Sequence, residues 1–178
     1  MIDAYAHLPE IADLEGALAR AQAVGVERII TVGMNLESNQ RNQGLGRQFP
    51  GLVLPAYGYH PWSIKATEIE ANLEFLAQNL PEAVALGEVG LDYKAKVKKN
   101  LQREVFARLL ELARQHDRPV IIHTRFSYQR ALTMVREAGI SRAVFHWYSG
   151  PLEVLREILA AGYLISATPA LAYSIAHQ

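Results

Sequence analysis

The sequence predicts an α/β protein of the (β/α)8 TIM-barrel type, and three observations carry this prediction. Seven short apolar or β-branched runs recur along the chain, and stretches with helical periodicity separate them. Strands and helices that alternate in this way form a parallel sheet with right-handed crossovers. An open doubly wound sheet also fits, but neither of its usual phosphate-binding motifs, G-x-G-x-x-G and G-x-x-x-x-G-K-[ST], follows a predicted strand. The barrel is therefore the favoured architecture.

The predicted strands number one fewer than a closed barrel needs. They cover residues 2–5, 28–32, 52–56, 83–86, 119–122, 143–145 and 163–166. A closed barrel has eight strands and typically about 250 residues. Because the sequence has 178 residues, we expect about seven βα units, with the C-terminal unit missing from this chain.

The clearest predicted helix is "NLQREVFARLLELARQH", residues 100–116. Its residues Leu101, Val105, Leu109 and Leu112 form one apolar stripe at helical spacing. Other helices are expected over about 10–23, 66–79, 128–138 and 152–161, with Gly25, Gly139 and Gly162 placed where helices commonly end.

The segment "LESNQRNQGLGRQF", residues 36–49, is predicted to be a poorer helix. Gly44 and Gly46 lie inside it, and each glycine costs about 1 kcal/mol relative to alanine in a helix interior.

Composition limits the classes of protein and of site. The length suits a single domain over residues 1–178, and half of the residues are hydrophobic. Eighteen basic residues balance eighteen acidic ones, so net charge neither supports nor excludes a nucleic-acid partner. The absence of cysteine excludes disulfides and thiolate metal sites. No stretch resembles a membrane span or a signal peptide, so a cytoplasmic location without a membrane partner is expected.

Polar side chains gather at the predicted strand ends. His7, His60, His123 and His146 come just after the first, third, fifth and sixth predicted strands, and Glu88 follows the fourth. All strand C-termini meet at one face of a barrel, so these five residues should converge. Imidazoles and a carboxylate without thiols suit Zn²⁺, Mn²⁺ and similar divalent ions.

Each of these residues also has a simpler interpretation. A lone histidine at a strand end is usually a solvated or hydrogen-bonded loop residue. Glu88 alone could accept hydrogen bonds from a loop backbone that the neighbouring glycines allow to approach. His116 is interpreted as a cation near a helix C-terminus, and nothing assigns a role to His177. The case for a site therefore depends on the whole set.

Five segments carry a resemblance to a known family. "IDAYAHL", "YGYHPW", "GEVGLDY", "PVIIHTR" and "FHWYSG", in this order, resemble the TatD family of metal-dependent deoxyribonucleases, within the wider metal-dependent hydrolase barrels. The similarity spans nearly the whole chain. It implies a (β/α)8 barrel that uses divalent metal ions, one or two of Zn, Mn or Mg, to hydrolyse the phosphodiester bonds of DNA.

The resemblance also implies the metal ligands. The family's first-strand H-x-H supplies two ligands to one ion, but here Tyr5 occupies the first place and only His7 matches. Glu88 matches the carboxylate that contacts both ions, and His123 and His146 match the ligands of the second ion. A phenol must lose a proton, with a pKa near 10, to become a strong ligand. The second ion therefore keeps more strong protein ligands than the first. The aspartate that the family carries after its eighth strand has no counterpart in this chain.

The resemblance also implies which residues contact the substrate, and these residues have alternative interpretations. Glu88, His60 and Arg125 are the predicted catalytic residues, with His60 and Arg125 placed to contact substrate phosphate. Trp62, Trp147 and Tyr148 would stack on bases. Alternatively, Arg125 forms a helix-flanking ion pair and the aromatic residues only pack the loops. The same chemistry would also serve a lactone or amide hydrolase, and the two departures from the family favour an impaired barrel that acts as a binding module.

Overall fold

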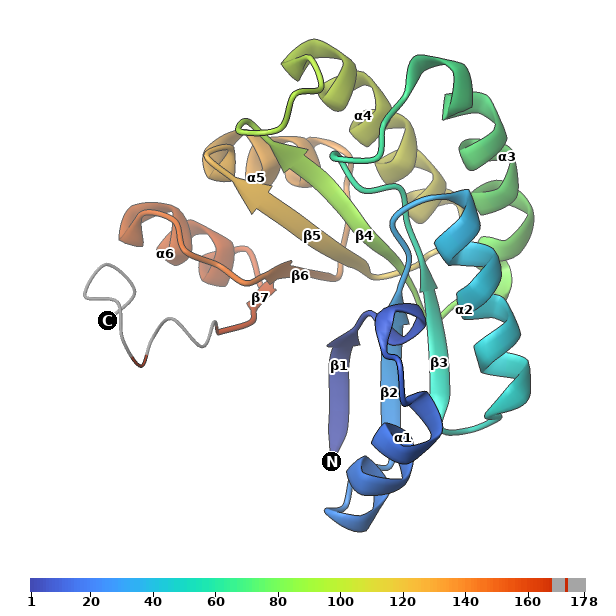
Figure 1. Cartoon of the computed structure of the whole chain (residues 1–178). Helices are drawn as coiled ribbons and strands as arrows, with labels where there is room; N and C mark the ends of the chain where they lie inside the picture. The colour runs from blue at the N-terminus through green and yellow to red at the C-terminus, as the bar shows by residue number, and fades with distance from the viewer. Residues whose placement is uncertain (168–171, 173–178) are drawn as a thin grey trace.

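The computed structural model describes residues 1–167 and residue 172. Seven strands form one parallel sheet whose spatial order follows the sequence. The sheet curls, with helices along its outer side, into a half-barrel (Figure 1). The strands are β1 (Ile2–Ala6), β2 (Arg28–Val32), β3 (Val53–Tyr57), β4 (Ala85–Asp92), β5 (Val120–Arg125), β6 (Ala143–His146) and β7 (Leu164–Ile165). The predicted fold class is confirmed.

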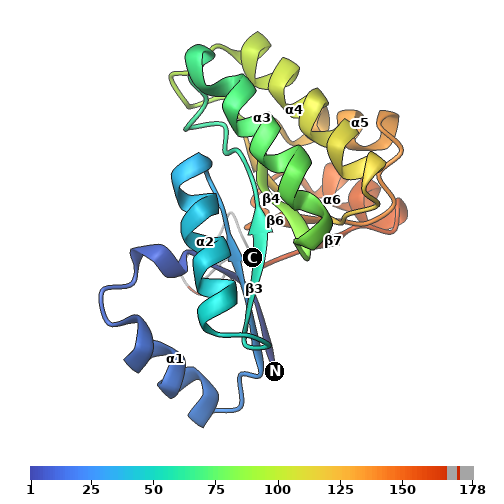
Figure 2. The ribbon, with the colours of Figure 1, turned by 90° about the vertical axis from the view of Figure 1, so that its right-hand side faces the viewer.

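Six α-helices connect the strands. Figure 2 shows α1 and α2 beside the first strands, with α3 and α4 next to them. The helices are α1 (Leu14–Ala23), α2 (Leu36–Gln48), α3 (Ile69–Asn79), α4 (Lys99–Gln115), α5 (Tyr128–Glu137) and α6 (Leu152–Ala160), and 3-10 turns occupy Leu8–Glu10, Ala66–Glu68 and Leu80–Glu82. The predicted helix over 10–23 is therefore divided, because only its part from Leu14 onward is α-helical. His116 caps the C-terminal end of α4, as predicted. His177 lies outside the described residues.

The helix predicted over residues 36–49 is present as α2, which is complete over thirteen residues despite its two glycines. A capping box between Asn35 and Ser38 fixes its first turn. The wholly buried Asn39 then binds both backbone groups of Gly58, which follows β3. A Cβ at Gly46 would lie 2.6 Å from the Pro55 side chain, so glycine lets α2 pack closely on β3. Tertiary contacts thus outweigh the weak helix propensity.

Hydrophobic residues fill both faces of the sheet. The largest cluster lies between the later strands and α3 to α6, and it includes the fully buried Leu76, Phe106, Ile122 and Phe145. A smaller cluster beneath the first helices contains Leu8, Leu18, Ile29 and Val53. A third contains Val32, Ala56, Ala85 and Ile121, with Tyr5 packed against it. Since strand side chains alternate between the two faces, Ile29 and Val32 of β2 point to opposite sides, and the third cluster marks the concave inner face.

Strand β4 differs most from its predicted bounds. It runs from Ala85 to Asp92 with every residue buried, whereas the sequence predicts a strand that ends at residue 86. Glu88 therefore lies within β4 rather than after it, and His123 and His146 likewise lie inside β5 and β6. The glycines on either side of Glu88 lie where neighbouring strands approach closely. A Cβ at Gly90 would lie 2.1 Å from the His123 carbonyl oxygen.

Over the part of the chain that the structure describes, no helix combines the length and the apolar character needed to cross a membrane.

Candidate metal and substrate site

The predicted site residues converge on one cavity at the C-terminal ends of the strands. Its volume is about 820 Å³. The cavity brings together every residue that the sequence predicts as ligand or catalytic group, and its lining includes Tyr5, His7, His60, Trp62, Glu88, His123, Arg125, His146 and Trp147. Side chains from β1, β4, β5 and β6 and from the loops after β1 and β3 therefore share one space.

Glu88 occupies the floor of this cavity. Its side chain is 3% exposed, and its backbone N–H donates to the Gly33 carbonyl oxygen at 2.9 Å. A Cβ at Gly58 would lie 2.4 Å from the Glu88 backbone nitrogen, so a side chain at Gly58 would displace this backbone. The fold thus fixes a carboxylate at the centre of the site.

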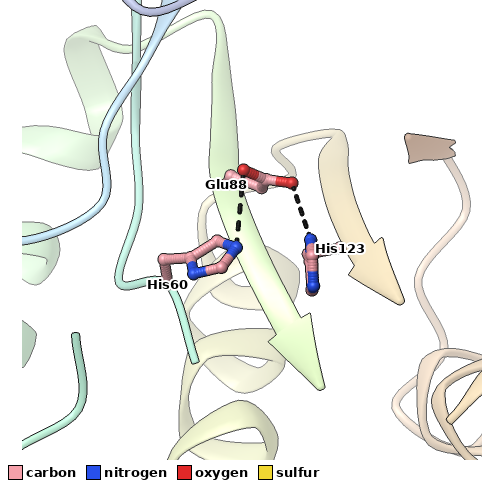
Figure 3. A group of neighbouring side chains, drawn as sticks. All are labelled: His60, Glu88 and His123. Carbon is pink, nitrogen blue, oxygen red and sulfur yellow. Dashed lines mark ion pairs between the residues drawn. The ribbon is translucent and has the colours of Figure 1, made fainter. Parts of the chain in front are cut away.

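Two histidines flank this carboxylate (Figure 3). His123 Nδ1 lies 3.3 Å from Glu88 Oε1, and His60 Nε2 lies 3.6 Å from Glu88 Oε2. The three residues offer ligand atoms that all lie within 4.8 Å of one another. One carboxylate with imidazole nitrogens is a donor set that suits Zn²⁺ or Mn²⁺. The residues present therefore fit a divalent ion beside Glu88.

Hydrogen bonds distinguish the two histidines. His123 Nε2 lies 3.0 Å from Asp92 Oδ2, and a carboxylate can only accept, so Nε2 carries a hydrogen. Its Nδ1 faces Glu88 Oε1, to which it donates when the ring is protonated, and in the neutral ring Nδ1 has the lone pair that an ion would bind. His60 is the reverse case. Its Nδ1 accepts the backbone N–H of Trp62 at 3.2 Å, which leaves the hydrogen of the neutral ring on Nε2. His123 is thus arranged as a ligand, whereas His60 is arranged as a hydrogen-bond donor into the cavity.

The charge states follow from burial and from these contacts. Burial lowers the pKa of His60 to about 3, so its imidazole is neutral at neutral pH. Burial by itself would raise the pKa of Glu88, but the hydrogen bond from His123 and the neighbouring imidazoles outweigh it and lower that pKa to about 2. Burial opposes protonation of His123, yet contacts with Glu88 and Asp92 raise its pKa above the ordinary value. Glu88 is therefore an ionised carboxylate.

Asp92 is a site residue that the sequence analysis missed. It is wholly buried, and its Oδ2 accepts a hydrogen bond from Trp62 Nε1 at 2.6 Å in addition to the contact with His123. Burial raises its pKa, but these hydrogen bonds and one from the Lys94 backbone lower it overall. Asp92 lies four residues after Glu88 in the same strand, so both share one face. The even spacing of Glu88 and Asp92 in the sequence could therefore have identified Asp92 as a site residue.

Tyr5, on β1, and His7, just after it, line the same cavity as Glu88. The Tyr5 hydroxyl donates to Glu88 Oε2 and lies 2.9 Å from His7 Nε2. Burial and the adjacent Glu88 carboxylate raise the pKa of Tyr5, so the phenol stays protonated. Its ring stacks on His146 with a centroid separation of 3.5 Å. His146 Nδ1 lies 3.0 Å from the Ser166 hydroxyl.

The cavity mouth carries exposed aromatic and basic groups. Trp62 is 54% exposed and Trp147 is 48% exposed, and Arg125 is exposed at the end of β5. Tyr148 instead is buried, and its hydroxyl donates to the Pro151 carbonyl oxygen at 2.7 Å. Of the three aromatic residues considered for base stacking, the two tryptophans face the opening and Tyr148 packs its loop.

Comparisons with known proteins agree with this geometry. The sequence model of the family described as TatD related DNase matches residues 2–178. The uncharacterized metal-dependent hydrolase YabD of Bacillus subtilis strain 168 is 33% identical over 174 residues, which cover 93% of this chain and 68% of that protein. A 3'-5' ssDNA/RNA exonuclease TatD of Escherichia fergusonii is 34% identical over 164 residues, covering 88% of this chain and 61% of that protein.

A solved structure shares the fold. The structure of YjjV, a TatD homologue from Escherichia coli K12, superposes with a TM-score of 0.81 at 27% identity and covers 93% of this chain and 66% of that one. The chain thus spans about two thirds of the length of these relatives. With a family match over nearly the whole sequence and a carboxylate and histidines gathered at the strand ends, this chain belongs to the family of TatD-related DNases.

Proposed function

We propose that this chain is a metal-dependent hydrolase that cleaves phosphodiester bonds in single-stranded nucleic acid. The observation that supports it most strongly is the ionised Glu88 at the floor of the cavity, with His123 Nδ1 at 3.3 Å from its Oε1 and His123 Nε2 held by Asp92. Two relatives support the proposal, since one is named a metal-dependent hydrolase and the other an exonuclease of ssDNA and RNA. The cytoplasmic location expected from the sequence would give such an enzyme access to nucleic acid.

Three of the four predicted ligands, Glu88, His123 and His146, are proposed as metal ligands, and the fourth, His7, contacts the Tyr5 hydroxyl instead. Glu88 and His123 have the strongest geometric support, because their facing atoms lie 3.3 Å apart. His146 borders the same cavity from the neighbouring strand. A divalent ion bound there, Zn, Mn or Mg, would lower the pKa of a bound water and neutralise charge on the phosphoryl oxygens.

The chain's own side chains would hold the substrate around this centre. His60 would donate its Nε2 hydrogen to a phosphoryl oxygen, since its Nδ1 is occupied by the Trp62 backbone N–H. Arg125 would pair with a backbone phosphate at the rim. Trp62 and Trp147 would stack on bases, a contact that tolerates any sequence. Histidine and arginine side chains would thus position the phosphates, and tryptophan side chains would position the bases.

A nuclease assay with a matched control tests the proposal. Purified protein is given 5'-labelled single-stranded DNA with Mn²⁺, and products are resolved by length. We expect cleavage that EDTA abolishes and that falls at least about 100-fold in Glu88→Gln, the scale of loss seen when a metal-centred group is removed. Glu137→Gln, on the outer helix α5, should cleave like the parent.

Two results would contradict the proposal. Cleavage that persists in Glu88→Gln, or that is indifferent to EDTA, would remove the metal centre from the reaction. Hydrolysis of lactone or amide substrates without any cleavage of DNA would replace the proposed substrate class with the alternative considered from the sequence.

A further inference from the structure

The Tyr5 hydroxyl lies between the two side chains that the family resemblance implies for one of its ions. It contacts His7 Nε2 at 2.9 Å and donates to Glu88 Oε2. Tyr5 and His7 are two residues apart on and just after β1, so both side chains reach the same side of the sheet. The phenol thus occupies the line between the two expected ligands.

The hydrogens on Tyr5 and His7 determine which atoms still have a lone pair for an ion. A phenol carries one hydrogen, and Tyr5 gives it to Glu88, which can only accept. The 2.9 Å contact with His7 then requires a hydrogen from His7 Nε2. That nitrogen therefore has no lone pair to offer an ion, and one oxygen of Glu88 is already occupied.

The surroundings hold the Tyr5 ring in this place. The ring stacks on His146 with an interplanar angle of 7° and meets the His7 ring edge-on with centroids 5.1 Å apart. It also packs against the inner-face cluster of Val32, Ala56, Ala85 and Ile121. Moving the phenol oxygen away from Glu88 requires the ring to move, which would break the stack, so packing fixes the position of that oxygen.

The opposite side of Glu88 remains available. Its Oε1 faces Nδ1 of His123 at 3.3 Å, and in the neutral ring that nitrogen has the lone pair, because Asp92 holds the hydrogen on Nε2. The two carboxylate oxygens of Glu88 therefore serve different partners: Oε2 binds a phenol and Oε1 faces a ligand nitrogen.

We propose that the Tyr5 hydroxyl takes the place of an ion between His7 and Glu88, so that this chain binds a single divalent ion, on the side of Glu88 that faces His123. The inference depends on the proposed function, because it presupposes a metal ligated by Glu88. Phosphate charge would then be neutralised by one ion together with Arg125, instead of by two ions, and the neutral His60 would add a hydrogen bond.

Metal stoichiometry tests this without any measurement of activity. Metal-free protein is titrated with Mn²⁺ by calorimetry, and the bound ions are examined by electron paramagnetic resonance. We expect one equivalent in the parent. Tyr5→His replaces the phenol with a neutral ligand and should bind two equivalents, whose signal shows coupling between ions that share Glu88. Tyr5→Phe keeps the ring stack but frees His7 and Glu88 Oε2, so it should gain a second, weaker equivalent.

The double variant Tyr5→Phe with His7→Gln leaves no imidazole on this side of Glu88; it is the matched control and should return to one equivalent. Circular dichroism establishes that each variant is folded, and Tyr5→Phe provides the test if Tyr5→His does not fold. Two equivalents in the parent would overturn the inference, as would a single equivalent in both Tyr5→Phe and Tyr5→His. No binding by the parent or by any variant would instead contradict the metal site of the proposed function, and the inference with it.

Discussion

Asp92 holds His123 in a single orientation. Its Oδ2 lies 3.0 Å from His123 Nε2, and the aspartate is wholly buried. The same oxygen accepts the indole N–H of Trp62 at 2.6 Å. One buried carboxylate therefore connects a proposed metal ligand with an aromatic side chain at the cavity mouth.

Asp92→Asn should weaken metal binding by about 10- to 100-fold, the usual effect of losing a group that orients a ligand. An amide is uncharged and offers one oxygen in place of two, so it holds the Nε2 hydrogen of His123 less firmly. Mn²⁺ titration of the metal-free protein measures the change.

Trp62→Phe serves as the control for Asp92→Asn. It removes the other hydrogen bond to Asp92 Oδ2 and leaves the contact with His123. Metal affinity should change much less than in Asp92→Asn, while binding of single-stranded DNA weakens. Equal losses of metal affinity in the two variants would show that Asp92 does not act through His123.

Asn39→Ala should destabilise the protein by about 2–4 kcal/mol, because it leaves two buried backbone groups without partners. Asn39 Oδ1 accepts the Gly58 N–H at 2.9 Å, and its Nδ2 donates to the Gly58 carbonyl oxygen at 2.8 Å. Urea denaturation measures the free energy of unfolding. Gln40→Ala, an exposed position on the same helix, should stay within about 0.5 kcal/mol of the parent. Similar values for both variants would mean that the Gly58 contacts contribute little.

The sequence predicts the barrel-type sheet and the convergence of the candidate residues because both depend on chain topology. Parallel strands place their C-terminal ends together, so His7, His60 and His123 meet in one cavity whatever their exact rotamers. The sequence also predicts helix α2, but only as a poorer helix than the others. Its stability depends on the contact between Asn39 and Gly58, nineteen residues apart, and local propensity does not report such a contact.

Finer features of the site depend on hydrogen-bond direction. The sequence shows that Tyr5 replaces a histidine, but only the structure shows that its hydroxyl engages His7 and Glu88 together. The opposite ring orientations of His60 and His123 likewise follow from two partners, the Trp62 backbone and Asp92. These partners are set by packing, which spacing along the chain does not determine.

Arg125→Ala should raise the KM for single-stranded DNA roughly tenfold or more, the scale of one charge-assisted hydrogen bond, with a smaller effect on kcat. Arg125 is exposed at the rim, and no ion pair involves it among the described residues. The salt dependence of DNA binding should also become shallower, since one phosphate contact is lost. Arg136→Ala, on the outer helix α5, should leave both quantities near the parent values. An unchanged KM in Arg125→Ala would exclude the phosphate contact.

His60 should make the metal-free protein sensitive to acid. Burial lowers its pKa in the folded state to about 3, against an ordinary value of 6.5. Between these two values the unfolded chain has bound a proton that the folded chain has not, so the free energy of unfolding falls as pH falls. The contribution of one such group reaches at most about 1.4 kcal/mol per pH unit. It is absent above pH 6.5, where both states are neutral at this residue.

The comparison that isolates this effect is His60→Gln against His116→Gln, with urea denaturation of metal-free protein at intervals from pH 7 to pH 4. His60→Gln removes the titrating group, so its stability should decline less steeply with acid than that of the parent. His116 lies at the end of α4, outside the cavity, and its replacement should retain the parent's slope. Parallel profiles for the parent and His60→Gln would mean that His60 is protonated as readily in the folded chain as in the unfolded one, which would contradict its burial as a neutral donor beside Glu88.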